Sequence, residues 1–183
     1  MNVNIKRMSP DAQIPQYAHA SDACFDLVAA EDVVIEPGET ALVKTGLAFE
    51  IPEGYEMQIR PRSGITLKTK LRVQLGTVDC GYAGEVGVIV DNIWDSDLDL
   101  SCYVFRIDGS RSTIHDREVF YGSYKIRKGD RLAQAVIKPV EQAVFTEVDT
   151  LGDSDRGAGG FGSSGVGSPH PEYFGEPIGK ELI

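Results

Sequence analysis

Short runs of alternating apolar and polar residues recur along the chain, whereas helical periodicity is almost absent. The runs are rich in Val, Ile, Leu and aromatic residues, and turn-forming residues such as Pro37-Gly38 separate them. Strands at this spacing are typical of a β-sandwich or a β-barrel. We therefore expect an all-β fold, with strands within residues 33–35, 41–51, 55–60, 71–75, 86–90, 102–107 and 132–140, and one short helix within 63–70.

Two segments depart from this pattern and set the expected domain boundaries. Residues 94–124 start with alternating aspartates and read as a long excursion or an extra hairpin within a core domain of residues 1–148. Residues 149–167 are dominated by Gly, Ser and Asp, which cannot build a hydrophobic core, so we expect a flexible segment there. Residues 168–183 read as a C-terminal tail.

Composition and charge narrow the classes of function. The 183 residues are 42% hydrophobic and 25% charged, which is ordinary for a globular protein. A net charge of -10 without a Lys/Arg-rich block argues against a polymeric nucleic-acid partner, but not against a small anionic ligand. No apolar run suits a membrane span or a secretion signal, so we expect a cytoplasmic protein without a membrane partner. The 3 cysteines form no CxxC pair, which argues against a disulfide framework or a zinc ribbon.

The most unusual local feature is the glycine-rich stretch at residues 156–165. Backbone N–H groups freed from bulky side chains can converge on phosphate oxygens, and Arg156, Ser163 and Ser164 add further donors. The GxGxxG spacing within it is accidental, because no hydrophobic strand leads into it and no helix follows. From this stretch alone, an anion-binding loop and a linker are equally well supported, and Phe161 favours binding because a base can stack on it.

Three other segments carry residues suited to a phosphate or to catalysis, although each alone also reads as an ordinary turn. Residues 61–64 (Pro-Arg-Ser-Gly) end a strand. Residues 76–84 form a tight hairpin with a carboxylate and an aromatic side chain at its tip. Residues 129–134 place Arg131 and Gln134 at the start of a strand.

Together with residues 20–27, these segments stand in the order of the motifs of the trimeric dUTPase family, which the chain resembles over residues 3–166. The resemblance implies a jelly-roll-like β-barrel that assembles as a homotrimer, with active sites between subunits. It implies Mg²⁺-assisted hydrolysis of dUTP to dUMP and pyrophosphate by water attack at the α-phosphate. This reaction limits uracil incorporation into DNA and supplies dUMP. Residues 149–167 would then be a lid that closes over the site.

The resemblance also assigns roles to individual residues. Asp79 would be the base that activates the water, and Asp26 would hold Mg²⁺ through a water molecule. The main chain of the hairpin would read uracil, Tyr82 would pack on the deoxyribose, and Phe161 would stack on the base. The residues implied to bind substrate are Arg62, Ser63, Gly64, Gly76, Thr77, Val78, Tyr82, Arg131, Gln134, Arg156, Phe161, Gly162, Ser163 and Ser164.

The chain also departs from the family pattern. Cys24-Phe25 replaces the usual Gly-Tyr, and Gln74 stands on the hairpin arm where many members carry an Asn. An insertion like that at 94–124 occurs in some phage-encoded dUTPases, where it is linked to binding other proteins. This predicts a protein partner as a second, regulatory function and, for a phage protein, the host cytoplasm as its location. A related activity, dCTP deamination, is not expected, because Ile89 stands where that chemistry needs a glutamate and Gly64 stands where it needs a second serine.

Overall fold

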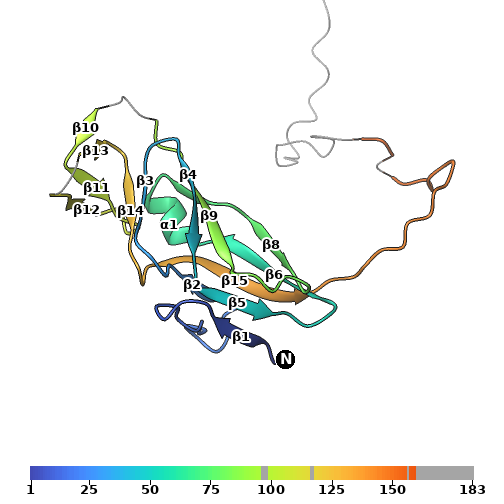
Figure 1. Cartoon of the computed structure of the whole chain (residues 1–183). Helices are drawn as coiled ribbons and strands as arrows, with labels where there is room; N and C mark the ends of the chain where they lie inside the picture. The colour runs from blue at the N-terminus through green and yellow to red at the C-terminus, as the bar shows by residue number, and fades with distance from the viewer. Residues whose placement is uncertain (96–98, 116–117, 156, 160–183) are drawn as a thin grey trace, which may run out of the picture. The chain divides into compact units, whose positions relative to one another are not determined.

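The computed structural model describes residues 1–95, 99–115, 118–155 and 157–159 (Figure 1). The chain divides into a first unit, Met1–Gln142, and a second, Ala143–Ile183. In the second unit the described residues, 143–155 and 157–159, form neither strand nor helix. The elements of the first unit are β1 (Asn4–Arg7), β2 (Phe25–Val28), β3 (Val33–Ile35), β4 (Thr40–Lys44), β5 (Leu47–Glu50), β6 (Tyr55–Pro61), α1 (Ser63–Lys68), β7 (Leu71–Val73), β8 (Gly76–Asp79), β9 (Gly87–Asn92), β10 (Leu100–Ser101), β11 (Tyr103–Phe105), β12 (Arg111–Thr113), β13 (Val119–Phe120), β14 (Tyr124–Ile126) and β15 (Arg131–Pro139).

The prediction of an all-β fold with one short helix is confirmed for the described residues. The predicted strand at 41–51 is wrong as a single element, because it is divided into β4 and β5 at Gly46. Gly46 has φ of 69°, which is a left-handed conformation, and an added Cβ would lie 2.8 Å from the Cβ of Ala12. Alternation does not reveal such a break. It also missed β1, β2, β8, β12 and β14, which are 3 or 4 residues long, and β10 and β13, which have 2 residues each.

The sheet that matters most for function has the strand order β2-β15-β6-β8. Its long strand β15 pairs antiparallel with both β2 and β6, so that Gln134 lies opposite Asp26 on one side and Arg60 on the other. The register between β15 and β2 shifts between Arg131 and Ala133. Such an irregularity redirects a side chain at the start of a strand. The sheet therefore brings residues from distant parts of the sequence to one place.

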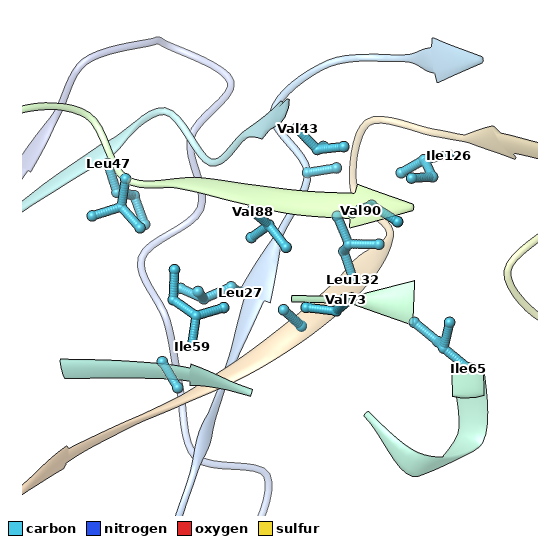
Figure 2. Packing of buried hydrophobic residues seen from close by; sticks show 14 of the residues in the cluster. Leu27, Val43, Leu47, Ile59, Ile65, Val73, Val88, Val90, Ile126 and Leu132 are labelled. Carbon is cyan, nitrogen blue, oxygen red and sulfur yellow. The ribbon is translucent and has the colours of Figure 1, made fainter. Parts of the chain in front are cut away.

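Apolar side chains from most strands of the first unit form one core (Figure 2). The burial pattern along β9 shows why the strands pack as they do: Val88 and Val90 are buried, whereas Ile89 between them is exposed. Period-two alternation places one face of each strand inside. Leu27, Val43, Ile59, Val73 and Leu132 approach this centre from other strands in Figure 2.

The predicted insertion extends a sheet with the order β12-β11-β14-β3 (Figure 1). The ring of Trp94 stacks on Phe105 at 4.9 Å between centroids, and Phe105 lies 5.5 Å from Tyr124. The side-chain amide of buried Asn92 donates to the carbonyls of Ile35 and Gly122, so it connects β9 with β3 and with the turn before β14. The insertion is thus packed on the rest of the first unit through aromatic contacts and a buried amide.

Candidate functional site

A pocket of about 640 Å³ opens beside the sheet β2-β15-β6-β8 and the helix α1. It collects residues from three of the sequence segments singled out above. Asp26 comes from β2, Arg62, Ser63 and Gly64 come from the β6–α1 junction, and Arg131 and Gln134 come from β15. The six predicted site residues in this pocket are therefore neighbours in space, although Asp26 and Arg131 are 105 positions apart in sequence.

Two arginines hold one carboxylate in this pocket. Arg62 Nε lies 3.1 Å from Asp26 Oδ1, and Arg131 Nη1 lies 3.2 Å from Asp26 Oδ2. Arg62 also donates from Nη1 to the carbonyl of Arg131 at 2.8 Å. The Asp26 side chain is 19% exposed and that of Arg131 is 58% exposed. The carboxylate thus orients two guanidinium groups that keep donors free for an anion, because each guanidinium has five N–H groups.

Main-chain contacts complete the pocket. Gln134 donates from Nε2 to the carbonyl of Pro61 at 2.8 Å, which fixes the end of β6 against β15. The first turn of α1 is closed by Ile65 and Thr66, whose N–H groups both donate to the carbonyl of Arg62. Arg62 and Ser63 therefore stand on a rigid corner between strand and helix.

The hairpin after β8 is built around the side chain of Tyr82. The main-chain N–H of Tyr82 donates to the carbonyl of Asp79 at 3.0 Å, and the Tyr82 hydroxyl donates to the carbonyl of Glu85 at 2.9 Å. Position 84 needs a glycine, because a Cβ there would lie 2.6 Å from the Tyr82 hydroxyl. Glu85 accepts a hydrogen bond from the N–H of Gly46, which fastens the hairpin to the β4–β5 junction.

Asp79 is exposed on this hairpin at the end of β8, opposite Glu56 of β6. Gly76, Thr77 and Val78 form the rest of β8, the outer strand of its sheet, so that one edge of its main chain pairs with no strand among the described residues. None of these residues, nor Tyr82, lines the pocket that holds Asp26. Within one chain, the predicted site therefore consists of two separate halves.

Five predicted site residues, namely Arg156, Phe161, Gly162, Ser163 and Ser164, lie outside the described residues, as does the tail at 168–183. Gln74, on the arm of the hairpin, is engaged with Asp91 of β9, and Asp91 also accepts a hydrogen bond of 2.7 Å from Thr40. The amide of Gln74 is thus already held by its own chain.

Some pocket residues, from α1 and from the predicted insertion, were not among the predicted site residues. Lys68, at the end of α1, lines the pocket together with Ile107 and Asp108 of the turn after β11. A hydrogen bond from the Ser110 hydroxyl, followed by one from the Ser110 N–H, lowers the pKa of the Asp108 carboxyl. Gly109 allows this turn to approach α1, because its Cβ would lie 3.3 Å from the carbonyl of Lys68. No sequence signal connects these residues, since only the folded chain places the turn beside α1.

A metal ion that is bound directly by a protein needs several His, Cys, Asp or Glu ligands close together. Among the described residues, no group of three or more His, Cys, Asp or Glu side chains is arranged to hold a metal ion. Asp26 accepts one guanidinium donor on each oxygen, which leaves acceptor positions free for a water molecule. The residues present therefore fit an ion that reaches the protein through water and is carried mainly by its ligand.

An all-β domain whose pocket presents two oriented arginines, a serine and an amide has the donors that suit an anionic, phosphate-like ligand. The chain belongs to the dUTPase family: the family model matches residues 10–103 and 121–165.

Known relatives agree with this assignment. The deoxyuridine 5'-triphosphate nucleotidohydrolase of Thermobifida fusca is 46% identical over 90% of this chain and 79% of its own length. That of Nautilia profundicola is 44% identical over 90% of this chain and 99% of its own. The predictions of the family and of a hydrolase are confirmed.

Solved structures extend the agreement to the fold. The dUTPase of Staphylococcus bacteriophage 80alpha with dUPNHPP has a TM-score of 0.86 and 38% identity, over 90% of this chain and 99% of that chain. The dUTPase of phage phi11 of S. aureus, described as showing a species-specific insert, has a TM-score of 0.79 and 36% identity, over 82% of this chain and 98% of that chain. The prediction of an all-β dUTPase fold is confirmed.

The family model also bears on the insertion. It passes over residues 104–120, which lie within the predicted insertion of 94–124. The unmatched residues include Ile107 and Asp108 of the pocket. A part of this chain that the family model does not match therefore contributes to the wall of the candidate site.

Proposed function

We propose that the chain hydrolyses dUTP to dUMP and pyrophosphate in sites completed between the subunits of a homotrimer. The observation that carries this proposal is the separation of the two halves of the site. The arginine-bearing pocket fits the triphosphate, whereas the hairpin with Asp79 fits the nucleoside and the attacking water. Since one chain does not bring the halves together, a second copy supplies the missing half.

An exposed apolar pair supports assembly. Leu42 of β4 and Ile89 of β9 are opposite each other in the sheet β4-β9-β7, and they are 60% and 48% exposed. Leu42 also lies over Gly87, where an added Cβ would meet its Cδ1 at 2.5 Å. Apolar side chains on the outer face of a sheet are typical of a surface that another subunit covers.

In the proposed reaction, the Asp79 carboxylate takes a proton from a water molecule whose oxygen attacks the α-phosphorus. The bond from that phosphorus to the oxygen bridging to the β-phosphate breaks, and pyrophosphate leaves with the electron pair. Arg62, Arg131 and Ser63 hold phosphate oxygens and offset the developing charge. Asp26 holds these arginines in place and would accept a hydrogen bond from a water molecule of a bound Mg²⁺. That ion, when present, would offset part of the triphosphate charge.

Specificity is assigned to the hairpin. The unpaired main-chain edge of β8, at Gly76, Thr77 and Val78, presents donors and acceptors that match the pairing edge of uracil. A narrow hairpin leaves no room for the 5-methyl group of thymine. Tyr82, fixed by its bond to Glu85, packs where a 2'-hydroxyl would lie and so disfavours UTP.

Residues 149–167 are proposed to close over the bound nucleotide, with Arg156, Ser163 and Ser164 on its phosphates and Phe161 on its base. The described part of this segment, 149–155 and 157–159, is exposed and has no regular structure of its own, which suits a segment that gains order from a ligand. Closing excludes water and completes the group that binds the triphosphate.

The reaction is tested by measuring pyrophosphate release from dUTP, dTTP, UTP and dCTP, each with and without Mg²⁺. We expect release from dUTP that depends on Mg²⁺ and little from the other nucleotides. Ammonia released from dCTP is the control for deamination, and clear ammonia release without pyrophosphate release from dUTP would contradict the proposal. The protein-binding role of the insertion and a cytoplasmic location stay predictions.

A further inference from the structure

A second polar groove, of about 740 Å³, lies on the sheet β12-β11-β14-β3 and shares no lining residue with the nucleotide pocket. Strand alternation explains its position. Tyr124 and Ile126 of β14 point into the core, so Lys125 between them points to the other face beside Val34, its partner across the sheet. The residues 112–115 of the insertion and the residues that follow β11 and β14 form the rest of the groove.

The groove is basic in a protein whose net charge is -10. Arg106, Lys125 and Arg127 line it, together with His115 and the hydroxyls of Ser112 and Thr113. Among the described residues that line it, the one carboxylate is that of Asp32. Positive side chains from two separate segments, Arg106 after β11 and Lys125 and Arg127 at β14, therefore meet at one place.

The carboxylate of Asp32 is already satisfied. It lies 2.8 Å from Lys125 Nζ and accepts a hydrogen bond of 2.8 Å from the N–H of Lys128. The bond from Lys125, followed by that from Lys128, lowers the pKa of Asp32, and Arg127 adds only a longer-range attraction. Arg127 forms no ion pair among the described residues, so its charge stays available for a ligand.

The buried guanidinium of Arg106 gives a second, independent argument for an anion in this groove. Its side chain is 8% exposed, and its Nη2 lies 3.9 Å from Asp130, which is the outer limit for an ion pair. Its Nε and Nη1 have no hydrogen-bond partner among the described residues. A buried guanidinium with so little compensation is unfavourable, so a negative charge placed in the groove beside it would be stabilised.

We propose that this groove binds a phosphate-type oxyanion, either free phosphate or pyrophosphate or the phosphate of a small phosphomonoester. Guanidinium, ammonium and hydroxyl donors that converge from several directions match the many acceptors of a phosphate better than the two of a carboxylate. The Arg106 charge is compensated on binding, and Arg127 and the hydroxyls of β12 make the direct contacts. This inference goes beyond dUTP hydrolysis and does not depend on it.

The test is isothermal titration of the full-length protein with inorganic phosphate, pyrophosphate and dUMP, with the nucleotide pocket saturated by dUpNHpp. Arg127→Gln removes the free cation of the groove. Lys128→Gln is the matched control, because it makes the same charge change on the neighbouring residue, whose ammonium pairs with Asp11 outside the groove. Circular dichroism checks that both variants are folded.

We expect the wild type to bind at least one of the three ligands. The dissociation constant should rise at least tenfold in Arg127→Gln and change less than twofold in Lys128→Gln. Binding of phosphate or pyrophosphate but not dUMP identifies the free ion, whereas binding of dUMP identifies a phosphomonoester. Absence of binding at millimolar ligand, or an equal loss in both variants, overturns the proposal. Turnover of dUTP in the same samples separates this result from the proposed catalytic function.

Discussion

Arg62 Nε lies 3.1 Å from Asp26 Oδ1, and this contact joins the end of β6 to the start of the sheet at β2. It makes the carboxylate of Asp26 an anchor for the cations of the pocket. An acidic side chain in an anion pocket is unfavourable for the ligand itself. Asp26 is nevertheless useful in this pocket, because its carboxylate fixes the side chains of Arg62 and Arg131.

Replacing this anchor is the first test. Asp26→Asn removes the negative charge that orients Arg62 and Arg131, so we expect KM for dUTP to rise about tenfold, the size of one lost charge-assisted hydrogen bond. Steady-state kinetics measures it. Asp32→Asn, which removes a carboxylate paired with Lys125 outside this pocket, is the control. An unchanged KM in Asp26→Asn would show that the arginines do not need the carboxylate.

The second prediction concerns the proposed base. Asp79→Asn keeps the shape of the hairpin but cannot take a proton, so kcat should fall by about 10²- to 10⁴-fold while dUpNHpp still binds. Cys80→Ser, a change at the adjacent exposed residue, should leave kcat within twofold. Turnover like the wild type in Asp79→Asn would remove this residue from the mechanism.

Assembly is tested on the outer face of the sheet β4-β9-β7. Leu42→Glu places a charge on a side chain that is 60% exposed in one chain, so the fold should persist while subunits separate. Light scattering should then give a mass near 19.9 kDa instead of about three times that value, and dUTP turnover should be lost. Leu67→Glu, on an exposed residue of α1, is the control. A Leu42→Glu protein that stays trimeric would place the interface elsewhere.

Sugar selection is tested at the hairpin. Gly84→Ala adds a Cβ at 2.6 Å from the Tyr82 hydroxyl, so the ring must move and lose its bond to Glu85. We expect the ratio of kcat/KM for UTP to that for dUTP to rise about tenfold, the usual effect of a lost steric contact. Gly81→Ala in the same hairpin meets nothing within 4 Å and should keep the ratio. If Gly84→Ala and Gly81→Ala show the same ratio of kcat/KM for UTP to that for dUTP, Tyr82 does not select the sugar.

The fifth prediction concerns the stability of the region that carries the insertion. Tyr124 is buried and accepts a hydrogen bond of 3.0 Å from the N–H of Lys70. Tyr124→Phe leaves that N–H without its acceptor, so the free energy of unfolding should fall by about 1–2 kcal/mol at pH 7 in urea denaturation.

The pH dependence of this difference follows from the raised pKa of Tyr124, which is caused by its burial. In the unfolded chain the phenol ionises near pH 10, whereas in the folded chain it stays neutral to higher pH. The contribution of Tyr124 is therefore complete below about pH 10 and is lost as the pH rises above that value. The stability difference between wild type and Tyr124→Phe should narrow there, and a constant difference would contradict this account.

Much of the site could be predicted from local sequence because its residues stand in compact motifs. Arg62 and Ser63 follow a strand, Asp79 ends a strand just before a turn, and Arg131 and Gln134 lie at the start of a strand. Lys68, Ile107 and Asp108 could not be predicted, because α1 and the turn after β11 meet only through packing. The break at Gly46 was missed for the same reason, since Ala12 makes that glycine necessary.

The sequence by itself determined the all-β class and the helix after β6, because alternation and turn residues are local properties, and its motifs predicted the residues of the candidate site. Only the tertiary structure decided that Asp26 lies between Arg62 and Arg131, that the hairpin of Asp79 stands apart from that pocket, and that the insertion supplies part of its wall. Strand register and packing bring together residues that are distant in sequence, and no local pattern encodes which ones will meet.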